Sequence, residues 1–298
     1  MIRIILAIGG NSLNLEIMKY FSYDLNAPTT SAFVQQRGKI LLGAFKEIFE
    51  NFTNSSLVPK THKGYRLLAV DGSSFCISHN PNDKKTYISK RENSKGSNHL
   101  HLNAVYDLCN RVYVDAIIQN GREIDERQAL IDVIQNKKDK NVKSIYIADR
   151  GYESYNLFEH MNQNGQKYVI RVKDINSKSI SSSLNIQSKE IIDKNINLLM
   201  TRRQTNEIKL NKKKYRFLAK SSKFDFLPTS SKNTYPLSFR IVRFPISETR
   251  NEVLITNLSE DEFSVEELKE LYRLRWGIET SFRELKYSIG LINLHSKK

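Results

Sequence analysis

The sequence predicts an α/β protein built on a mixed β-sheet, and two observations lead to that class. Between residues 65 and 173, apolar and alternating segments give the order βββαβαβ. Three consecutive strands followed by alternating helix and strand indicate a mixed sheet covered by helices, not the all-parallel sheet of doubly wound proteins. A helical pattern returns after residue 258, so a further helix is expected to follow the sheet.

Composition points to a folded protein with a polyanionic partner. The chain has 298 residues, 39% of them hydrophobic, and its 47 Lys and Arg against 32 Asp and Glu give a net charge of +15. Such a balance favours a nucleic-acid partner, although a ribosomal or merely solubilising role would look similar. Only Cys76 and Cys109 are present, too few for a disulfide framework, so a reducing cytoplasm is expected. The apolar opening MIRIILAIGG is too short to span a membrane, and no membrane segment or export is expected.

The first elements are a helical lead-in and three strands. SAFVQQRGKILLGAFKEIFENF (31 to 52) has the apolar spacing of an amphipathic helix, with Gly38 as a break between two helices. GYRLLAVDGSSF reads as a buried strand whose C-terminal end presents Asp71. HLHLNAVYDLCN and RVYVDAIIQN alternate as two strands that a tight turn near Asn110 joins.

The remaining elements alternate before the chain enters a longer β-rich segment. A helix is expected over 125 to 136, a strand over 143 to 152 with Asp149 near its end, a helix over 154 to 165 and a strand over 167 to 173. A mainly β insertion follows, and FSVEELKELYRLRWG then opens a helix with a Ser264 and Glu267 capping box. The expected regions are an N-terminal helical region at 1–60, the first part of the domain that contains the sheet at 61–173, the β-rich insertion with strands returning to the core at 174–258, and the closing helix at 259–298.

The closing helix carries a polar stripe beside an apolar face. At about 100° per residue, Tyr272, Arg275, Glu279 and Lys286 fall within a stripe roughly 60° wide. The neighbouring sector contains the apolar side chains expected to dock the helix: Leu271, Leu274, Ile278, Phe282, Leu285 and Ile289. Two interpretations stay open, a solvated face with an Arg275–Glu279 ion pair or an edge that faces a cleft.

Asp71 and Asp149 each follow an apolar run, in AVDG and IADRG, where a Gly turn is expected. They could simply cap those turns. Together with a helix carboxylate they would instead form an all-oxygen site for Mg²⁺ or Mn²⁺, and two such ions can activate water and stabilise the leaving oxygen of a phosphodiester. His99 and His101 lack the further ligands of a zinc site, and neither a phosphate-binding Gly loop nor a serine-hydrolase elbow occurs.

The spacing Tyr272-x2-Arg275-x3-Glu279-x6-Lys286, together with VDGSS and IADRGYES, resembles the DDE transposases of bacterial insertion sequences, specifically the insertion-sequence-four family. The resemblance implies an RNase H-like fold with a mainly β insertion between the second Asp and the Glu. It implies that Asp71, Asp149 and Glu279 are catalytic and hold two Mg²⁺ ions, for which Mn²⁺ can substitute.

The resemblance also implies DNA contacts. Tyr272, Arg275 and Lys286 match positions that contact the phosphate backbone near a transposon end, and Arg150 and Arg283 are expected to add phosphate contacts. The lone Trp276 is expected in the core, with a base-stacking platform as the alternative.

The function implied is metal-dependent cleavage at the ends of a mobile element and strand transfer into target DNA. The partners implied are double-stranded DNA, as terminal inverted repeats and target, and a second copy of the chain on paired ends; the location implied is the bacterial cytoplasm and its nucleoid. Two alternatives remain, a nuclease without strand transfer and a non-catalytic DNA-binding relative. Members of the family are longer, and this chain stops shortly after Lys286, at LINLHSKK, so a truncated member is expected.

Overall fold

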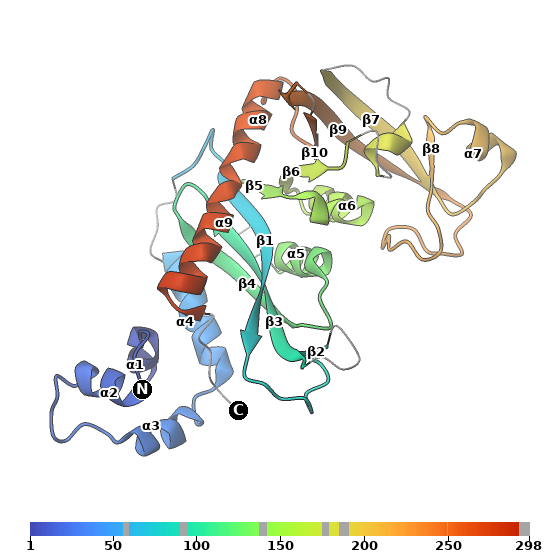
Figure 1. The fold of residues 1–298 in the computed structure, drawn as a ribbon. Coiled ribbons are helices and arrows are strands. Elements are labelled where there is room, and N and C mark those ends of the chain that lie inside the picture. The colour runs from blue at the N-terminus through green and yellow to red at the C-terminus, as the bar shows by residue number, and fades with distance from the viewer. Residues whose placement is uncertain are drawn as a thin grey trace.

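The computed structural model describes residues 1–55, 60–89, 95–136, 142–174, 179–184, 191–248 and 250–291. Four helices come first, α1 (Ile2–Ala7), α2 (Leu13–Tyr20), α3 (Thr30–Arg37) and α4 (Leu42–Ser55). The first three lie at one end of the molecule (Figure 1). Ile4, Ile17 and Phe33 form the buried cluster among them. The predicted helical lead-in is confirmed, and Gly38 caps α3 at the predicted break. The closing residues 292–298, on which the expectation of a truncated end rests, lie outside the described residues.

A single ten-stranded sheet runs through the described part of the molecule, in the order β2-β3-β1-β5-β6-β10-β9-β7-β8 with β4 paired to β3. Strands β1, β5 and β6 are parallel to one another, whereas β3, β9 and β10 pair antiparallel. The predicted mixed sheet is therefore confirmed. Its strands are β1 (Arg66–Ile77), β2 (Tyr87–Ile88), β3 (Ser97–Asp107), β4 (Val112–Asn120), β5 (Ser144–Ala148), β6 (Lys167–Val172), β7 (Ile192–Thr201), β8 (Tyr215–Phe217), β9 (Thr234–Ser247) and β10 (Arg250–Thr256).

Alternate side chains of β1 face two different sets of helices. Leu68 and Val70 pack in one cluster with α5 (Glu126–Gln135) and α6 (Tyr155–Gln163). Leu67 and Ala69 pack in clusters with α8 (Val265–Leu274) and α9 (Trp276–Arg283). Because successive side chains of a strand point to opposite faces, this alternation assigns one helix pair to each face of β1. In Figure 1, α8 and α9 cross β1 as a nearly continuous red rod.

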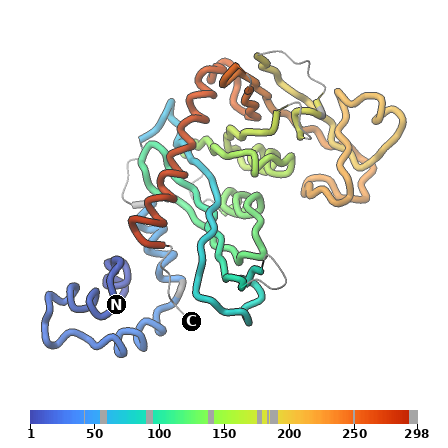
Figure 2. Tube along the Cα trace, viewed as in Figure 1, coloured from blue at the N-terminus to red at the C-terminus, as the bar shows by residue number. Residues whose placement is uncertain are grey.

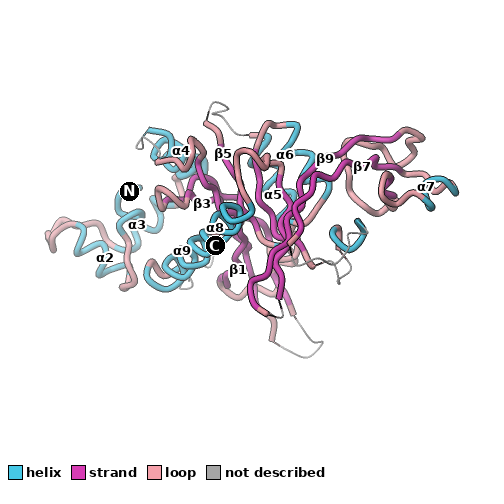
Figure 3. The backbone as a smooth tube through the Cα atoms, turned by 90° about the horizontal axis from the view of Figure 1, so that it is seen from above, coloured by secondary structure: helices cyan, strands magenta, loops and turns pink. Residues whose placement is uncertain are grey.

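The segment after β6 extends the same sheet away from the N-terminal helices. It contains the short helices η2 (Ser181–Leu184) and α7 (Asn206–Leu210) and returns through β9 and β10 to pair with β6. The buried Arg240 on β9 makes a bidentate pair with Asp193 on β7, its Nε and Nη2 donating to Oδ1 and Oδ2 at 2.7 and 2.6 Å. The trace in Figure 2 and the view from above in Figure 3 both show β7, β9 and α7 at the end opposite α2 and α3.

The closing helix is not the uniform α-helix that the angular calculation assumed. The capping box of Ser264 and Glu267 opens α8 as predicted, but α8 ends at Leu274 and α9 begins at Trp276. Arg275 stands between them, where an i to i+3 bond from its N–H to the Tyr272 carbonyl tightens the turn. A π-helical turn, η3 (Glu284–Ser288), follows α9 and widens the helix.

These two irregularities explain why only part of the predicted apolar face is buried. Leu271, Ile278 and Phe282 are buried and Leu285 is partly buried, as predicted. Leu274 and Ile289 are exposed, so the prediction was wrong for both. A constant 100° per residue no longer describes a helix whose turns first tighten and then widen.

Within the described residues, no helix combines the length and apolar character that a bilayer crossing requires.

Candidate active site

Asp71 lies inside β1 rather than at its C-terminal end, which corrects the prediction from AVDG. The strand continues through Gly72 to Ile77 because β3 still pairs with it, Asp71 opposite Ala104 and Gly72 opposite Asn103. The parallel ladder with β5, however, stops at Val70 opposite Ala148. Asp71 is thus the first residue of β1 beyond the end of β5, where the sheet opens on that side.

Asp149 is the residue that follows β5. It caps the short helix η1 (Arg150–Tyr152), and its Oδ1 accepts a bond of 2.7 Å from the Gly151 N–H. The turn-capping role considered from the sequence is therefore real. Because Val70 pairs with Ala148, the next residues of these adjacent parallel strands, Asp71 and Asp149, are brought side by side.

The surroundings of Asp71 favour its protonated form. The pKa of Asp71 is raised to about 6, first by burial and then by the negative charges of Asp149 and Glu126. The Gly72 N–H, 2.9 Å from Asp71 Oδ1, and the nearby Arg275 cation act in the opposite direction. Several carboxylates therefore share a region that lacks enough positive charge to balance them.

Arg275 links the first Asp to the Glu of the helix. Its Nη2 donates a 2.5 Å bond to Oε1 of Glu279, and its Nη1 lies 3.7 Å from Oδ2 of Asp71. The Arg275 side chain is 8% exposed, against 23% for Asp71 and 33% for Glu279. The Arg275–Glu279 pair considered from the sequence does form, but Arg275 is buried and shared with Asp71, so it is not a solvated surface pair.

The donor chemistry suits a hard divalent cation. Asp71, Asp149 and Glu279 offer only carboxylate oxygens, the ligands that Mg²⁺ and Mn²⁺ prefer. Burial is the main cause of the raised pKa of Asp71, with smaller contributions from the negative charges of Asp149 and Glu126, and a cation bound there would favour the ionised form. Within the described residues no three acidic, His or Cys side chains already stand in a metal-ligating arrangement. The guanidinium of Arg275 lies between two of the carboxylates, so a bound ion requires it to move or share them.

A family model described as "Transposase DDE domain" matches residues 62–298 of this chain. The chain belongs to this family. The match begins before β1 and includes Asp71, Asp149 and Glu279.

Individual relatives match over a shorter stretch. The transposase of insertion sequence element IS421 from Escherichia coli is 42% identical over 60 residues, which are 20% of this chain and 16% of that protein. The InsL protein of element IS186A from Escherichia coli strain K12 gives the same identity and coverage. The matched stretch therefore spans about a sixth of the length of these relatives.

Solved structures of other DNA-acting proteins resemble the chain more distantly. A piggyBac transposase synaptic complex with hairpin DNA superposes with a TM-score of 0.45 at 10% identity, covering 95% of this chain and 57% of that one. Ciona intestinalis Endonuclease V, solved with DNA, gives 0.31 at 8% identity, covering 82% of this chain and 97% of that one. Both TM-scores are below 0.5, so these likenesses do not establish a shared fold.

The residues expected to contact DNA occupy different environments in this family member. Arg150 and Arg283 are exposed, and Lys286 is half-buried in the π-helical turn. Tyr272 is buried, contrary to its place in a predicted polar stripe, because its ring packs in the core beneath α8. The Arg275 guanidinium lies 5.7 Å from the centre of that ring.

Trp276 is 62% exposed, so its predicted core position was wrong. The tightened turn at Arg275 directs the Trp276 ring away from the sheet, and the guanidinium lies 5.7 Å from its centre. The alternative considered from the sequence, a surface ring available for stacking, agrees with this exposure.

The sequence reasoning did not select Glu126 or Tyr152, which also reach this site. Both affect its electrostatics: Glu126 raises the pKa of Asp71, and the pKa of Tyr152 is raised by burial and by Glu126, Asp71 and Asp149. Glu126 lies neither at a strand end nor on the closing helix, where the other candidate carboxylates occur. A signal was present, because DERQALIDVIQN places Glu126 at the start of the helix that leads into β5.

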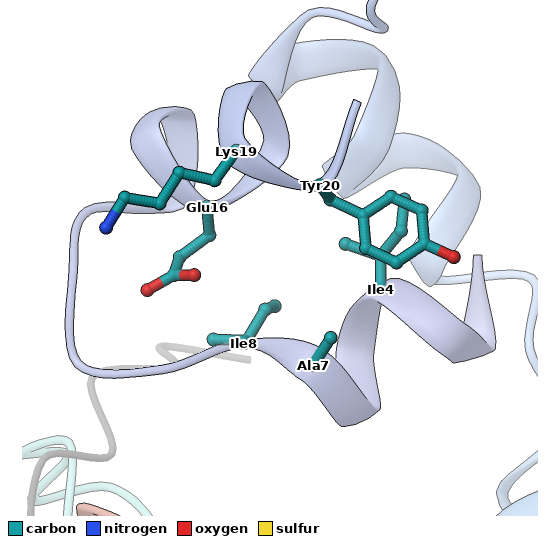
Figure 4. Close-up of a pocket in the computed structure, with 6 residues that line it drawn as sticks. All are labelled: Ile4, Ala7, Ile8, Glu16, Lys19 and Tyr20. Carbon is teal, nitrogen blue, oxygen red and sulfur yellow. The ribbon is translucent and has the colours of Figure 1, made fainter. Parts of the chain in front are cut away.

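Away from the Asp71 and Asp149 site, a surface pocket lies between α1 and α2 (Figure 4). Its carboxylate, Glu16, is already used: Oε1 accepts bonds from the backbone and side chain of Asn11 at 3.0 and 2.8 Å. This pocket has no connection to the Asp71 and Asp149 site, and its chemistry supports the local fold. Its lining residues are Ile4, Ala7, Ile8, Glu16, Lys19 and Tyr20.

Proposed function

We propose that this chain is a DNA transposase of an insertion sequence that cleaves DNA at the ends of its element and transfers the freed 3′ hydroxyl to target DNA. One observation carries the proposal: Asp71 and Asp149, from two adjacent parallel strands, lie side by side, and Arg275 joins Asp71 to Glu279 on the helix across the sheet. Family membership supports the same reaction class.

In this proposal Asp71, Asp149 and Glu279 hold two Mg²⁺ ions, with Mn²⁺ as a substitute. The chemistry that such ions supply when bound is activation of the attacking oxygen and stabilisation of the leaving oxygen of a phosphodiester. Water is the first nucleophile and leaves a free 3′ hydroxyl, which attacks a target phosphodiester in the second step. The side-by-side placement of Asp71 and Asp149 supports a shared site, because two nearby carboxylates are stabilised by a common cation.

Arg275 has a proposed role in each state of the site. Without metal it neutralises Asp71 and Glu279, and with DNA present its fork can bind a phosphate. Tyr272, buried beneath the guanidinium, supports Arg275 through the face of its ring. We assign phosphate contacts to Arg150, Arg283 and Lys286, whose charges fit a DNA backbone, and the net charge of +15 favours that partner.

The finer architecture is part of the proposal. We infer an RNase H-like catalytic domain formed by residues 61–173 and 259–298, interrupted by a β-rich insertion at 174–258 and preceded by the helical region 1–60. The mixed sheet with β1 beside β5 supports this division. Assembly of two copies on paired transposon ends is proposed from the family alone.

Plasmid nicking tests the function. Purified protein should nick supercoiled plasmid that carries the element's ends when Mg²⁺ is present, and chelation should stop it. Asp149→Asn and Glu279→Gln should abolish nicking but retain DNA binding in a gel-shift assay, because neither removes a basic residue. Equal nicking by these variants would disprove the catalytic assignment. Binding that depends on salt, without any nicking by the unchanged protein, would instead support a non-catalytic DNA-binding relative.

A further inference from the structure

A fourth carboxylate, Glu126, is fixed at the edge of the site by the start of α5. Asp125 caps this helix, its Oδ1 accepting a 2.9 Å bond from the Gln128 N–H. The next residue but one, Arg127, donates from Nε to the Gly151 carbonyl at 2.8 Å. This bond ties the first turn of α5 to the turn that follows Asp149. Glu126, between these two anchors, is therefore held against the site.

Gly72 leaves the space that the Glu126 carboxylate occupies, and Gly151 lies on its other side. Gly72 follows Asp71, and a Cβ atom built there would overlap Oε1 of Glu126 and Nε2 of His101. A Cβ on Gly151, two residues after Asp149, would lie 2.9 Å from Asp149 Oδ1 and 3.6 Å from Glu126 Oε2. One oxygen of Glu126 thus lies over the backbone beside Asp71, and the other lies toward Asp149.

The buried His101 ring lies beside the first of these oxygens. His101 Nε2 lies 2.9 Å from Glu126 Oε1, close enough for an ion pair when the ring is protonated. The other ring nitrogen, Nδ1, is 2.9 Å from the Ser74 hydroxyl. Because His101 is buried on β3 and Ser74 lies opposite it on β1, the sheet fixes the position of the His101 ring beside the Glu126 carboxylate.

The Tyr152 hydroxyl gives an independent sign that this region binds a ligand. Tyr152 is fully buried, and its hydroxyl finds no hydrogen-bond partner within the described part of the chain. The charges that act on it most strongly are those of Glu126, Asp71 and Asp149. A buried hydroxyl without a partner is costly, and the charges of these three carboxylates act on this one, so a polar ligand in the site would give it a partner.

We propose that Glu126 is a fourth carboxylate of the metal site, supplying an oxygen to the cation shared by Asp71 and Asp149, directly or through a coordinated water. This inference rests on the proposed function, since it adds a ligand to the same site. It gives Gly72 a purpose, which is to leave room for that carboxylate beside Asp71. It also explains why Glu126, on the helix that covers one face of the sheet, reaches the same site as Glu279, on the helix that covers the other face.

Manganese binding to the full chain without DNA tests this inference. The free Mn²⁺ signal in electron paramagnetic resonance would be titrated with unchanged protein, Glu126→Gln, Asp149→Asn and the control Glu123→Gln. Glu123 is exposed and three residues before Glu126, and its bond to the Asn120 side chain can be kept by Gln. Glu126→Gln should weaken Mn²⁺ binding about tenfold or more, as loss of a supporting metal ligand does, whereas Glu123→Gln should not.

The melting temperature of the metal-free protein separates a ligand from a structural residue. Removing one of several crowded carboxylates should leave that temperature unchanged or raise it, whereas a residue needed only for packing would lower it. Unchanged Mn²⁺ affinity in Glu126→Gln, with affinity lost in Asp149→Asn, would overturn this inference and leave the proposed function standing. Equal affinity in the unchanged protein and Asp149→Asn would overturn both. A lowered metal-free melting temperature in Glu126→Gln would assign it a structural role instead.

Discussion

Replacing Arg275 tests how the metal-free site balances its charge. Arg275→Gln removes the cation that bridges Glu279 at 2.5 Å and Asp71 at 3.7 Å. Breaking a fully buried ion pair costs about 3 to 5 kcal/mol. Both carboxylates are partly exposed, so water offsets some of this cost. We therefore expect the free energy of unfolding to fall by about 2 kcal/mol at pH 7.5. Urea denaturation of the metal-free protein, followed by circular dichroism, measures this difference in free energy of unfolding.

Arg273→Gln is the matched control. Arg273 lies two residues before Arg275, near the end of α8, and forms an exposed ion pair with Glu270. An exposed pair contributes about 0 to 1 kcal/mol, so this variant should stay close to the unchanged protein. Added Mn²⁺ should stabilise Arg275→Gln more than the unchanged protein, because the ion no longer competes with the guanidinium. Equal unfolding free energies for the two variants would refute the role we assign to Arg275.

Three further predictions concern the metal, the site glycine and the exposed tryptophan. Asp71 has a pKa of about 6 in the folded protein, so it binds a proton more tightly there than in the unfolded chain. Because that proton competes with the metal, Mn²⁺ affinity should fall by up to about tenfold per pH unit below 6. Binding that does not change from pH 5 to 8 would contradict this. Gly72→Ala should displace the Glu126 and His101 side chains, reduce the free energy of unfolding by about 1 to 3 kcal/mol and weaken Mn²⁺ binding. The control Gly43→Ala should not destabilise the protein, because a Cβ there meets no atom within 4 Å. Equal stability of the two variants would argue against the close packing at Gly72. Trp276→Ala should leave the urea midpoint nearly unchanged but weaken single-stranded DNA binding by about 1 to 3 kcal/mol, and unchanged binding would exclude a stacking role.

The same raised pKa has a consequence for stability without metal. Because the folded state holds the Asp71 proton more tightly than the unfolded state, this group favours folding more as pH falls through 6 toward its ordinary value of 3.8. Its contribution is therefore opposite in sign to that of a carboxylate stabilised by an ion pair.

Local pattern was sufficient to predict β1, β3, β4, β5 and β6 and the helices α5 and α6 between them. Alternation identified β3 and the partly exposed β4, and continuous apolar runs identified the buried parts of β1 and β5. The end of β1 was predicted wrongly at Asp71, since AVDG looks like a turn while the pairing of Gly72 with Asn103 keeps the strand extended. Long-range pairing of this kind leaves no trace in the local pattern.

The candidate site was only partly predictable for a related reason. Periodicity along one helix placed Arg275 and Glu279 together, and their bond is present. It could not anticipate that a tightened turn at Arg275 buries Tyr272 and exposes Trp276. Glu126 was missed because its proximity to Asp71 and Asp149 depends on how α5 packs beside β1, not on any spacing in the sequence.

A crystal structure of the protein soaked with Mn²⁺ would test the central claim most directly. Anomalous scattering locates manganese without assumptions about the ligands. The account predicts anomalous peaks bonded to carboxylate oxygens of Asp71 and Asp149, with Glu279 in the same site and the Arg275 guanidinium shifted from its bridging position. At saturating Mn²⁺, peaks only elsewhere in the molecule, with Arg275 still bridging Asp71 and Glu279, would contradict it.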